Sequence, residues 1–191
     1  MVKVAILGFG VVGSGVAEVL SGNGAGIQKK ADELIEVKYI LDVRDFPDSP
    51  FAQHFVKDFS VIEHDPEVNV VVETIGGVGA ALDFTERALK QGKSVVTSNK
   101  ELVATHGRRL LDLAAQNNAV YLFEASVGGG IPILRPLSEC MSANEILEIC
   151  GILNGTANYI FTRMVKDHVP FAEALAGAQA NGYAEQDPSA D

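Results

Sequence analysis

Three glycines near the start of the chain have the spacing of a pyrophosphate-binding turn. The aliphatic and β-branched run Val2–Leu7 predicts a strand, and residues 14–20 place apolar side chains at helical spacing. Between them, Gly8 permits a tight turn, Gly10 lets the backbone approach a pyrophosphate, and Gly13 lets the helix pack closely on the strand. A helix N-terminus offers free N–H groups to an anion, so the segment predicts a dinucleotide site. A purely structural turn is the alternative.

Two charged residues follow the second predicted strand, residues 37–41. In a dinucleotide-binding fold, the tip of this strand faces the adenine ribose, where a carboxylate selects a 2′-hydroxyl and an arginine accommodates a 2′-phosphate. Asp42 and Arg44 supply both groups and share one side of an extended strand. Lys57 could join Arg44 around a 2′-phosphate, which slightly favours NADP(H), whereas Asp42 favours NAD(H). The sequence leaves this choice open.

One lysine and three carboxylates are further candidates for chemistry. Lys100 follows a short predicted strand, where an ammonium group can reach a substrate oxygen or carboxylate. Glu185, Asp187 and Asp191 form an acidic cluster suited to the ammonium group of an amino acid. Taken alone, these side chains would also fit a solvated loop lysine and a solvated acidic loop.

The elements that would position these residues alternate between strand and helix over the first 125 residues. Further strands are predicted at 68–74, 94–97 and 120–123, helices at 79–91 and 106–117, and a surface loop at 21–26. The nearly continuous β-branched run at 68–74 is typical of a strand covered on both faces. The pattern predicts an α/β fold with a doubly wound parallel sheet, whose ligands bind at the carboxyl ends of the strands.

A glycine-rich segment predicts a domain boundary near residue 126. Three glycines and a proline lie within residues 125–132, and a short helix is predicted at 132–137. Beyond it, a strand is predicted at 145–153 and helices at 159–166 and 171–180. We therefore expect a dinucleotide-binding domain at 1–126 and an incomplete α/β domain at 127–191, because one strand provides too little sheet for a stable layer. A fragment, or a homodimer that shares strands across a two-fold axis, would explain this shortage.

Composition and charge argue against several classes of function. The formal net charge of -10 disfavours nucleic acid and anionic membrane surfaces as partners. No apolar run approaches the roughly 18–20 residues that span a bilayer, and a strand at the N-terminus leaves no room for a signal peptide, so a cytoplasmic protein is expected. Cys140 and Cys150 form no CxxC pair, the four histidines are scattered and no nucleophile elbow is present, which disfavours zinc and a hydrolase.

Six sequence blocks, in order along the whole chain, resemble homoserine dehydrogenase. They are residues 8–13, 71–77, 97–100, 125–132, 151–159 and 182–188. The resemblance implies a Rossmann domain followed by an α/β substrate and dimerisation domain. It also implies interconversion of aspartate 4-semialdehyde and L-homoserine with NAD(P)H, within threonine, methionine and isoleucine biosynthesis.

The resemblance also implies roles for individual residues. The catalytic candidates are Lys100 and Glu185. The cofactor would contact Gly8, Phe9, Gly10, Val11, Val12, Gly13, Arg44, Thr74, Lys100 and Gly182. The amino-acid substrate would contact Gly155, Thr156, Tyr183, Glu185, Asp187 and Asp191. Main-chain oxygens of Glu124, Val127, Gly129 and Ile131 would hold a sodium or similar monovalent ion, although a flexible hinge fits this segment almost as well.

The chain departs from the family pattern in its catalytic set. The family's further substrate-binding aspartate and the lysine assigned as proton donor have no counterpart within the 191 residues. Protonation of the developing alkoxide contributes about 10²–10⁴-fold to such a reaction, so the chain as given is expected to be a weak or inactive catalyst. A dinucleotide-binding module without turnover and another NAD(P)-dependent amino-acid or aldehyde oxidoreductase are the alternatives. Residues 151–159 and the acidic cluster argue against the second alternative.

Overall fold

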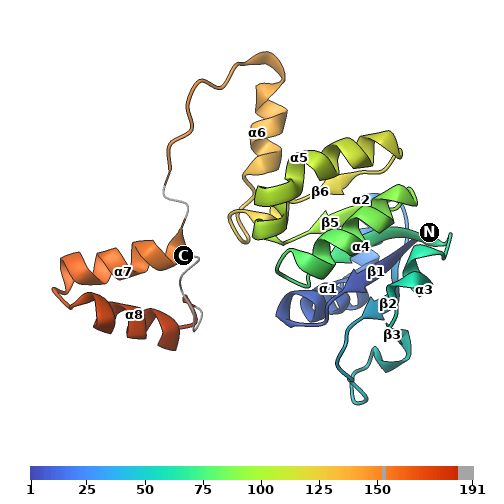
Figure 1. Cartoon of the computed structure of the whole chain (residues 1–191), viewed down its shortest axis with the longest axis horizontal. Coiled ribbons are helices and arrows are strands. Elements are labelled where there is room, and N and C mark those ends of the chain that lie inside the picture. The colour runs from blue at the N-terminus through green and yellow to red at the C-terminus, as the bar shows by residue number, and fades with distance from the viewer. Residues whose placement is uncertain (152–153, 185–191) are drawn as a thin grey trace. The chain divides into compact units, whose positions relative to one another are not determined.

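The computed structural model describes residues 1–151 and 154–184, which belong to two compact units (Figure 1). The first unit is Met1–Glu139, and the second begins at Cys140. In the described part of the chain, no helix is long and apolar enough to cross a membrane.

The first unit is built on a six-stranded parallel sheet in the order β3-β2-β1-β4-β5-β6. The strands are β1 (Val2–Leu7), β2 (Ile35–Leu41), β3 (Phe55–Val56), β4 (Val68–Glu73), β5 (Ser94–Thr97) and β6 (Tyr121–Leu122). The strand order reverses direction between β1 and β4, which makes their carboxyl ends the switch point where such sheets bind ligands. The doubly wound α/β fold predicted from the sequence is confirmed.

Helices cover both faces of this sheet (Figure 1). They are α1 (Val11–Gly22), α2 (Gly24–Ala31), α3 (Phe59–Glu63), α4 (Gly79–Lys90) and α5 (Lys100–Gln116). The chain also forms the 3-10 turns η1 (Ala52–His54) and η2 (Glu124–Ser126), the helix α6 (Leu134–Cys140), which buries no residue, and, after the end of the first unit, the 3-10 turn η3 (Met141–Ala143). Successive residues of β1 enter different cores: Val4 and Ile6 pack with Ala17 of α1, whereas Ala5 and Leu7 pack with residues of α4 and α5. The central strand is therefore buried on both sides.

The strand register brings three segments to one edge of the sheet. Leu7 of β1 pairs with Leu41 of β2 and with Glu73 of β4. The main chain continues this pairing, because the Gly8 N–H donates to the Leu41 carbonyl at 2.8 Å and the Thr74 N–H donates to the Leu7 carbonyl at 2.9 Å. The glycine turn therefore lies between the ends of β2 and β4.

Several predicted element boundaries were wrong. The predicted loop at 21–26 contains the start of α2, which packs on α1 and β2 although its two glycines disfavour a helix. The helix predicted from residue 106 begins at Lys100, because the Asn99 side chain caps it by accepting a hydrogen bond from the Leu102 N–H at 3.0 Å. β3 and α3 were not predicted, since both are too short for a periodic pattern.

The second unit contains the helices α7 (Gly155–Lys166) and α8 (Phe171–Ala180), which pack on each other as a hairpin. Their shared core consists of Ile160, Ala174, Ala178 and Ala184. The strand predicted at 145–153 is not formed over 145–151, because no other described segment of this unit offers it a strand to pair with. Residues 152 and 153 lie outside the described residues.

Candidate dinucleotide-binding site

Two glycines of the turn between β1 and α1 have no room for a side chain. Gly8 has a φ of +91°, and a Cβ there would lie 2.9 Å from the Thr74 carbonyl oxygen. At Gly13 a Cβ would lie 1.9 Å from the Gly8 carbonyl oxygen, far inside van der Waals contact. Gly10 differs, because a Cβ there would meet no protein atom within 4 Å. The fold therefore explains Gly8 and Gly13, whereas the space beside Gly10 is open to a ligand.

The N-terminus of α1 is open to an anion. Its N-cap residue, Gly10, has no side chain to bond the first N–H groups, and the first turn carries no acidic residue. These N–H groups and the positive end of the helix dipole suit a phosphate. Val11, the first residue of the helix, is 93% exposed and Val12 is 51% exposed, so apolar surface borders the helix end.

A buried carboxylate ties this turn to the end of β2. Asp42 accepts hydrogen bonds from the Phe9 N–H at 2.7 Å and the Arg44 N–H at 2.9 Å. The Arg44 guanidinium adds two bonds of 3.0 Å through Nε and Nη2. The hydrogen bonds from Arg44 hold the pKa of Asp42 well below its usual range, although burial acts in the opposite direction. The two residues predicted to face the ribose therefore lie together as a pair.

A second cation lies beside Arg44 at the end of β2. The Lys57 ammonium donates to the carbonyl oxygens of Val43 at 3.1 Å and Arg44 at 2.5 Å, and forms an ion pair of 2.7 Å with Asp45. The structure thus places the Lys57 ammonium against the main chain of Arg44, while the Arg44 guanidinium bonds Asp42.

An aromatic cluster packs beneath these charges and was not predicted. The ring of Phe9 meets those of Phe46 and Phe55 edge to face, with centroids 5.1 and 5.0 Å apart, and the Arg44 guanidinium lies 5.0 Å from the Phe46 centroid. Phe46 and Phe55 belong to a segment without strand or helix periodicity. Only their residue type could have signalled the cluster.

Thr74 holds the glycine turn from the β4 side. Its hydroxyl lies 2.9 Å from the Leu7 carbonyl oxygen and 3.0 Å from the Gly8 carbonyl oxygen. The side chain predicted to meet the cofactor therefore also fixes the backbone that would carry the pyrophosphate.

A buried polar network at the ends of β4 and β5 was also missed. The side chain of Glu73 is fully buried and accepts hydrogen bonds from the Ile75 N–H at 2.8 Å and the Thr97 hydroxyl at 2.5 Å. Asn99 continues the network into α5, whose first residue is the exposed Lys100. A glutamate that ends an otherwise apolar strand was the available signal.

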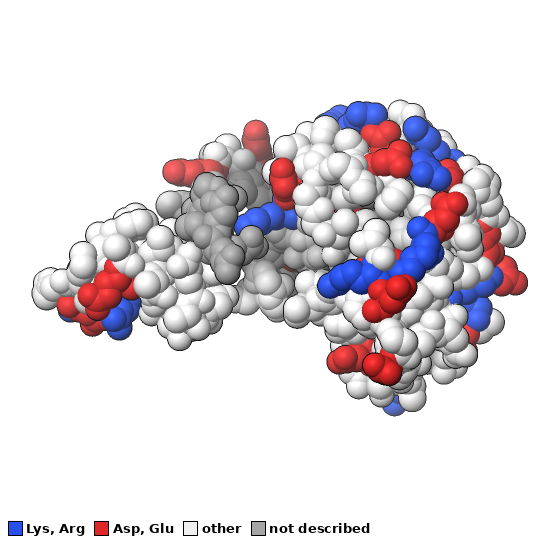
Figure 2. Space-filling view, turned by 60° about the horizontal axis from the view of Figure 1, so that its bottom comes forward, with Lys and Arg blue, Asp and Glu red and all other residues white. Residues whose placement is uncertain are grey.

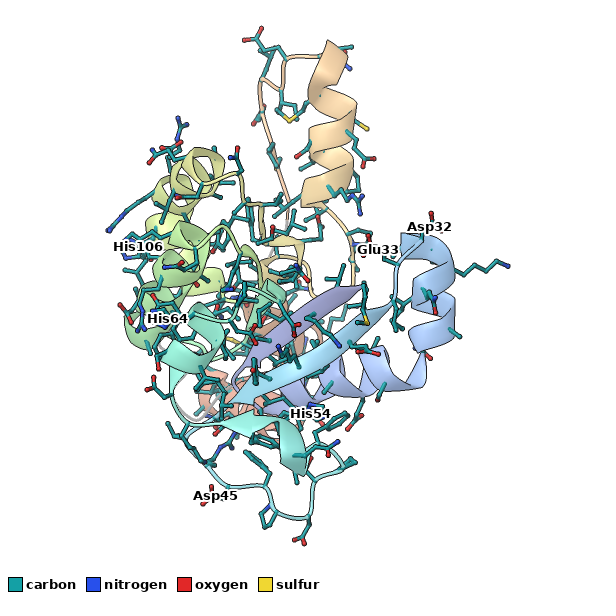
Figure 3. The ribbon with its side chains drawn as sticks, turned by 90° about the vertical axis from the view of Figure 1, so that its right-hand side faces the viewer. Asp32, Glu33, Asp45, His54, His64 and His106 are labelled. Carbon is teal, nitrogen blue, oxygen red and sulfur yellow. The ribbon has the colours of Figure 1, made fainter. Side chains whose placement is uncertain are left out.

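The side chain of Glu124 holds the loop that was predicted to bind a monovalent cation. The Glu124 carboxylate accepts hydrogen bonds from the N–H groups of Ile133 at 2.6 Å, Leu134 at 3.1 Å and Arg135 at 2.7 Å. These hydrogen bonds lower the pKa of Glu124, and the bond from Ile133 has the largest effect. Among the four main-chain oxygens proposed as ligands, that of Glu124 accepts a hydrogen bond of 3.3 Å from the Val127 N–H. The described residues contain no group of three or more His, Cys, Asp or Glu side chains that could hold a metal ion, and Figure 3 shows His54, His64 and His106 on separate segments.

The second unit gathers part of the predicted substrate set. The Thr156 hydroxyl donates to the Tyr183 carbonyl oxygen at 2.5 Å, next to Gly155 at the start of α7. Tyr183 exposes its ring, whose centroid lies 5.0 Å from that of Tyr159, and Gly182 has a φ of +74°. The predicted substrate ligands Glu185, Asp187 and Asp191 lie outside the described residues.

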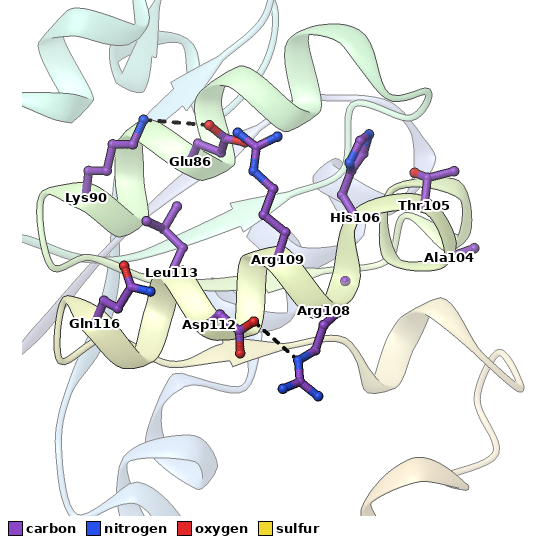
Figure 4. A pocket seen from close by; sticks show the side chains of 11 residues that line it. Glu86, Lys90, Ala104, Thr105, His106, Arg108, Arg109, Asp112, Leu113 and Gln116 are labelled. Carbon is purple, nitrogen blue, oxygen red and sulfur yellow. Dashed lines mark hydrogen bonds and ion pairs between the residues drawn. The ribbon is translucent and has the colours of Figure 1, made fainter.

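A pocket of about 600 Å³ between α4 and α5 contains none of the predicted site residues (Figure 4). Its charges are paired: Arg109 lies 2.6 Å from Glu86, and Arg108 lies 3.3 Å from Asp112. Figure 2 likewise shows basic and acidic side chains interspersed over one face of the first unit. Such a balanced surface gives no preference for a charged ligand.

Comparison with known proteins identifies the family. Residues 8–124 match the model "Homoserine dehydrogenase, NAD binding domain", and residues 132–191 match the model "Homoserine dehydrogenase". The homoserine dehydrogenases of Bacillus subtilis and Pseudomonas aeruginosa are 40% and 41% identical to the whole chain, which covers 45% and 44% of their lengths.

Solved structures agree with these matches. A crystal structure of a homoserine dehydrogenase from Thiobacillus denitrificans superposes with a TM-score of 0.88 at 36% identity, covering 98% of this chain and 44% of that one. A hyperthermophilic archaeal homoserine dehydrogenase in complex with NADPH gives a TM-score of 0.80 at 26% identity, covering 100% of this chain and 64% of that one. The chain thus spans about half the length of the curated relatives. The chain belongs to the homoserine dehydrogenase family, and its first unit carries the NAD-binding domain of that family.

Proposed function

We propose that this chain provides the cofactor-binding part of a homoserine dehydrogenase, which interconverts aspartate 4-semialdehyde and L-homoserine with a nicotinamide dinucleotide. The observation that carries the proposal is the glycine turn at the switch point of the sheet. There the N-terminus of α1 is open, and Gly10 leaves space for a pyrophosphate. The bound nicotinamide would supply or accept the hydride. The N–H groups that follow Gly10 would bind the pyrophosphate, flanked by the side chains of Phe9, Val11 and Val12.

The nicotinamide end would lie at the carboxyl ends of β4 and β5. Thr74 holds the turn from this side, and Lys100 begins α5 directly after β5. We propose that the Lys100 ammonium orients the substrate carbonyl oxygen or carboxylate, a task for which a charged donor is suited.

We propose that NADP(H) is the preferred cofactor. Asp42 already accepts four hydrogen bonds, three of them from Arg44, so a ribose 2′-hydroxyl would have to displace part of this pairing. The Arg44 side chain is 59% exposed, and the Lys57 ammonium lies against the main-chain oxygen of Arg44, so two cations at the end of β2 would be available to a 2′-phosphate if it replaced their pairing with Asp42 and Asp45.

The remaining assignments extend the same proposal to the second unit. Gly155, Thr156 and Tyr183, with Glu185, Asp187 and Asp191, would bind the amino-acid substrate, and Glu185 would act with Lys100 as a catalytic residue. Gly182 would contact the cofactor. Main-chain oxygens of Glu124, Val127, Gly129 and Ile131 would hold a monovalent cation. We also propose a cytoplasmic homodimer. We propose a domain boundary near residue 126, close to where the second family match begins at residue 132, although the first compact unit extends to Glu139.

Titration of the 191-residue chain with NADPH and NADH tests the cofactor site, and an aspartate 4-semialdehyde reduction assay on the same sample tests turnover. The matched variants are Gly10→Ala and Gly15→Ala, because a Cβ meets no protein atom within 4 Å at either position. Gly10→Ala should abolish binding by occupying the pyrophosphate site, whereas Gly15→Ala should bind like the wild type. Failure of the wild type to bind either nucleotide would refute the proposal. Binding without reduction would support a module that needs the rest of the enzyme for turnover.

A further inference from the structure

We propose that Glu73 is a positioning residue that fixes the nicotinamide end of the cofactor site. This inference rests on the proposed function, because it assigns a role within that site. Glu73 ends β4 at the switch point, and its side chain is fully buried. A parallel strand covered on both faces favours an apolar residue at such a position, since burial of a carboxylate is costly unless it is hydrogen-bonded.

The directions of the hydrogen bonds show what the carboxylate holds. The Asn99 N–H can only donate, and it donates to the Thr97 hydroxyl oxygen at 2.9 Å. The Thr97 hydroxyl therefore has its proton available for Oε2 of Glu73, at 2.5 Å. The other oxygen, Oε1, accepts the Ile75 N–H at 2.8 Å. Glu73 is thus the common acceptor for the segment after β4 and for Thr97, the last residue of β5.

Asn99 connects this network both to the segment after β4 and to the start of α5. Its Nδ2 donates to the Gly77 carbonyl oxygen at 2.6 Å, and its Oδ1 accepts the Leu102 N–H at 3.0 Å. Gly76 and Gly77 have φ values of +82° and +64°, so the segment after β4 has a conformation that few other residues adopt. The same network therefore fixes this segment and the start of α5, which carries Lys100.

The position of the network predicts a selective effect on one half of the cofactor. The adenosine half would lie at the end of β2, beside Asp42 and Arg44, on the other side of the glycine turn. Loss of the network should therefore weaken contacts to the nicotinamide and leave those to the adenosine and pyrophosphate in place. A role in folding alone would affect both halves equally.

Two buried threonines provide a matched pair of variants. Thr97 and Thr85 are 1% and 0% exposed. The Thr97 hydroxyl bonds Glu73, whereas the Thr85 hydroxyl has no hydrogen-bond partner in the described part of the chain. Replacement by valine keeps the side-chain shape at both sites. Thr97→Ser keeps the hydroxyl and should bind like the wild type.

The test measures the affinity of each variant for a dinucleotide and for the same molecule without its nicotinamide. The probes are NADPH with 2′-phospho-ADP-ribose, and NADH with ADP-ribose, titrated by calorimetry into the 191-residue chain. Thr97→Val should weaken the complete dinucleotide about five- to tenfold, the effect of one lost hydrogen bond, and leave the truncated ligand unchanged. Thr85→Val should bind all ligands like the wild type.

The possible outcomes separate this inference from the proposed function. If the wild type binds and Thr97→Val binds the dinucleotide equally well, or loses both ligands equally, the positioning role is refuted. If the wild type binds no ligand, the cofactor site itself is refuted. Should Thr97→Val fail to fold, Asn99→Asp replaces it, because a carboxylate still caps α5 but has no donor for the Gly77 oxygen. It should show the same selective loss.

Discussion

The Phe9 N–H donates a hydrogen bond of 2.7 Å to the carboxylate of Asp42, 33 residues further along the chain. This bond joins the glycine turn to the end of β2, so the pyrophosphate and ribose regions of the proposed cofactor site share one buried carboxylate. The geometry of each region therefore depends on the other.

Replacement of Asp42 by asparagine should destabilise the first unit. All four hydrogen bonds to Asp42 come from donors on Phe9 and Arg44, and an amide NH₂ would oppose some of them. We expect a loss of roughly 2 kcal/mol in the free energy of unfolding, measured with urea. Asp45→Asn is the control, because Asp45 is highly exposed and should tolerate the change. Equal stability of the two variants would contradict the role assigned to Asp42.

Asp42 should also make the free energy of unfolding depend on pH in the acidic range. The folded-state pKa of Asp42 lies below its unfolded value of about 3.9, so its contribution is complete above pH 4 and is lost as the pH falls towards the folded-state pKa. The stability difference between wild type and Asp42→Asn should therefore be constant near neutral pH and shrink below pH 4. Urea unfolding at several pH values would measure it, and a difference that stays constant down to pH 2 would exclude this linkage.

Two glycines of α1 should respond in opposite ways to alanine. At Gly13 the added Cβ would lie 1.9 Å from the Gly8 carbonyl oxygen, so Gly13→Ala should cost about 1–3 kcal/mol by overpacking. At Gly15 the Cβ meets nothing within 4 Å, and alanine should stabilise the helix by roughly 0.5–1 kcal/mol. Thermal unfolding compares the two variants. A stable Gly13→Ala protein would mean that α1 can move away from β1.

The glycine turn of the candidate dinucleotide-binding site was predictable because its sequence signals are local. The strand, the three glycines and the start of α1 follow one another within about twenty residues, and the parallel sheet follows from the apolar runs of β1, β4 and β5. The network of Glu73, Thr97 and Asn99 joins residues 24 positions apart, and only the strand register brings them together. The predicted strand at 145–153 is not formed over the described residues 145–151 for a related reason, because alternation of apolar and polar residues does not identify the partner strand that a strand requires.

Arg44→Ala should weaken NADPH more than NADH. The Arg44 side chain is 59% exposed, and a charge-assisted bond to a 2′-phosphate contributes enough to predict a loss of about tenfold or more for NADPH. NADH lacks that phosphate and should lose little. Arg108→Ala is the control, because Arg108 pairs with Asp112 on α5. Fluorescence titration measures both cofactors, and equal losses for the two would exclude a 2′-phosphate site at Arg44.

Glu124→Ala should loosen the start of α6 without disturbing the helices of the second unit. The carboxylate accepts three consecutive N–H groups at residues 133–135, and no other side chain among the described residues caps them. Hydrogen exchange measured by mass spectrometry should show faster exchange at these amides in the variant, with α7 as the internal control. The pKa of Glu124 is lowered from the ordinary glutamate value of about 4.3. The wild-type cap should therefore persist below that pH and be lost on further acidification. Unchanged exchange at residues 133–135 would show that α6 forms without this carboxylate.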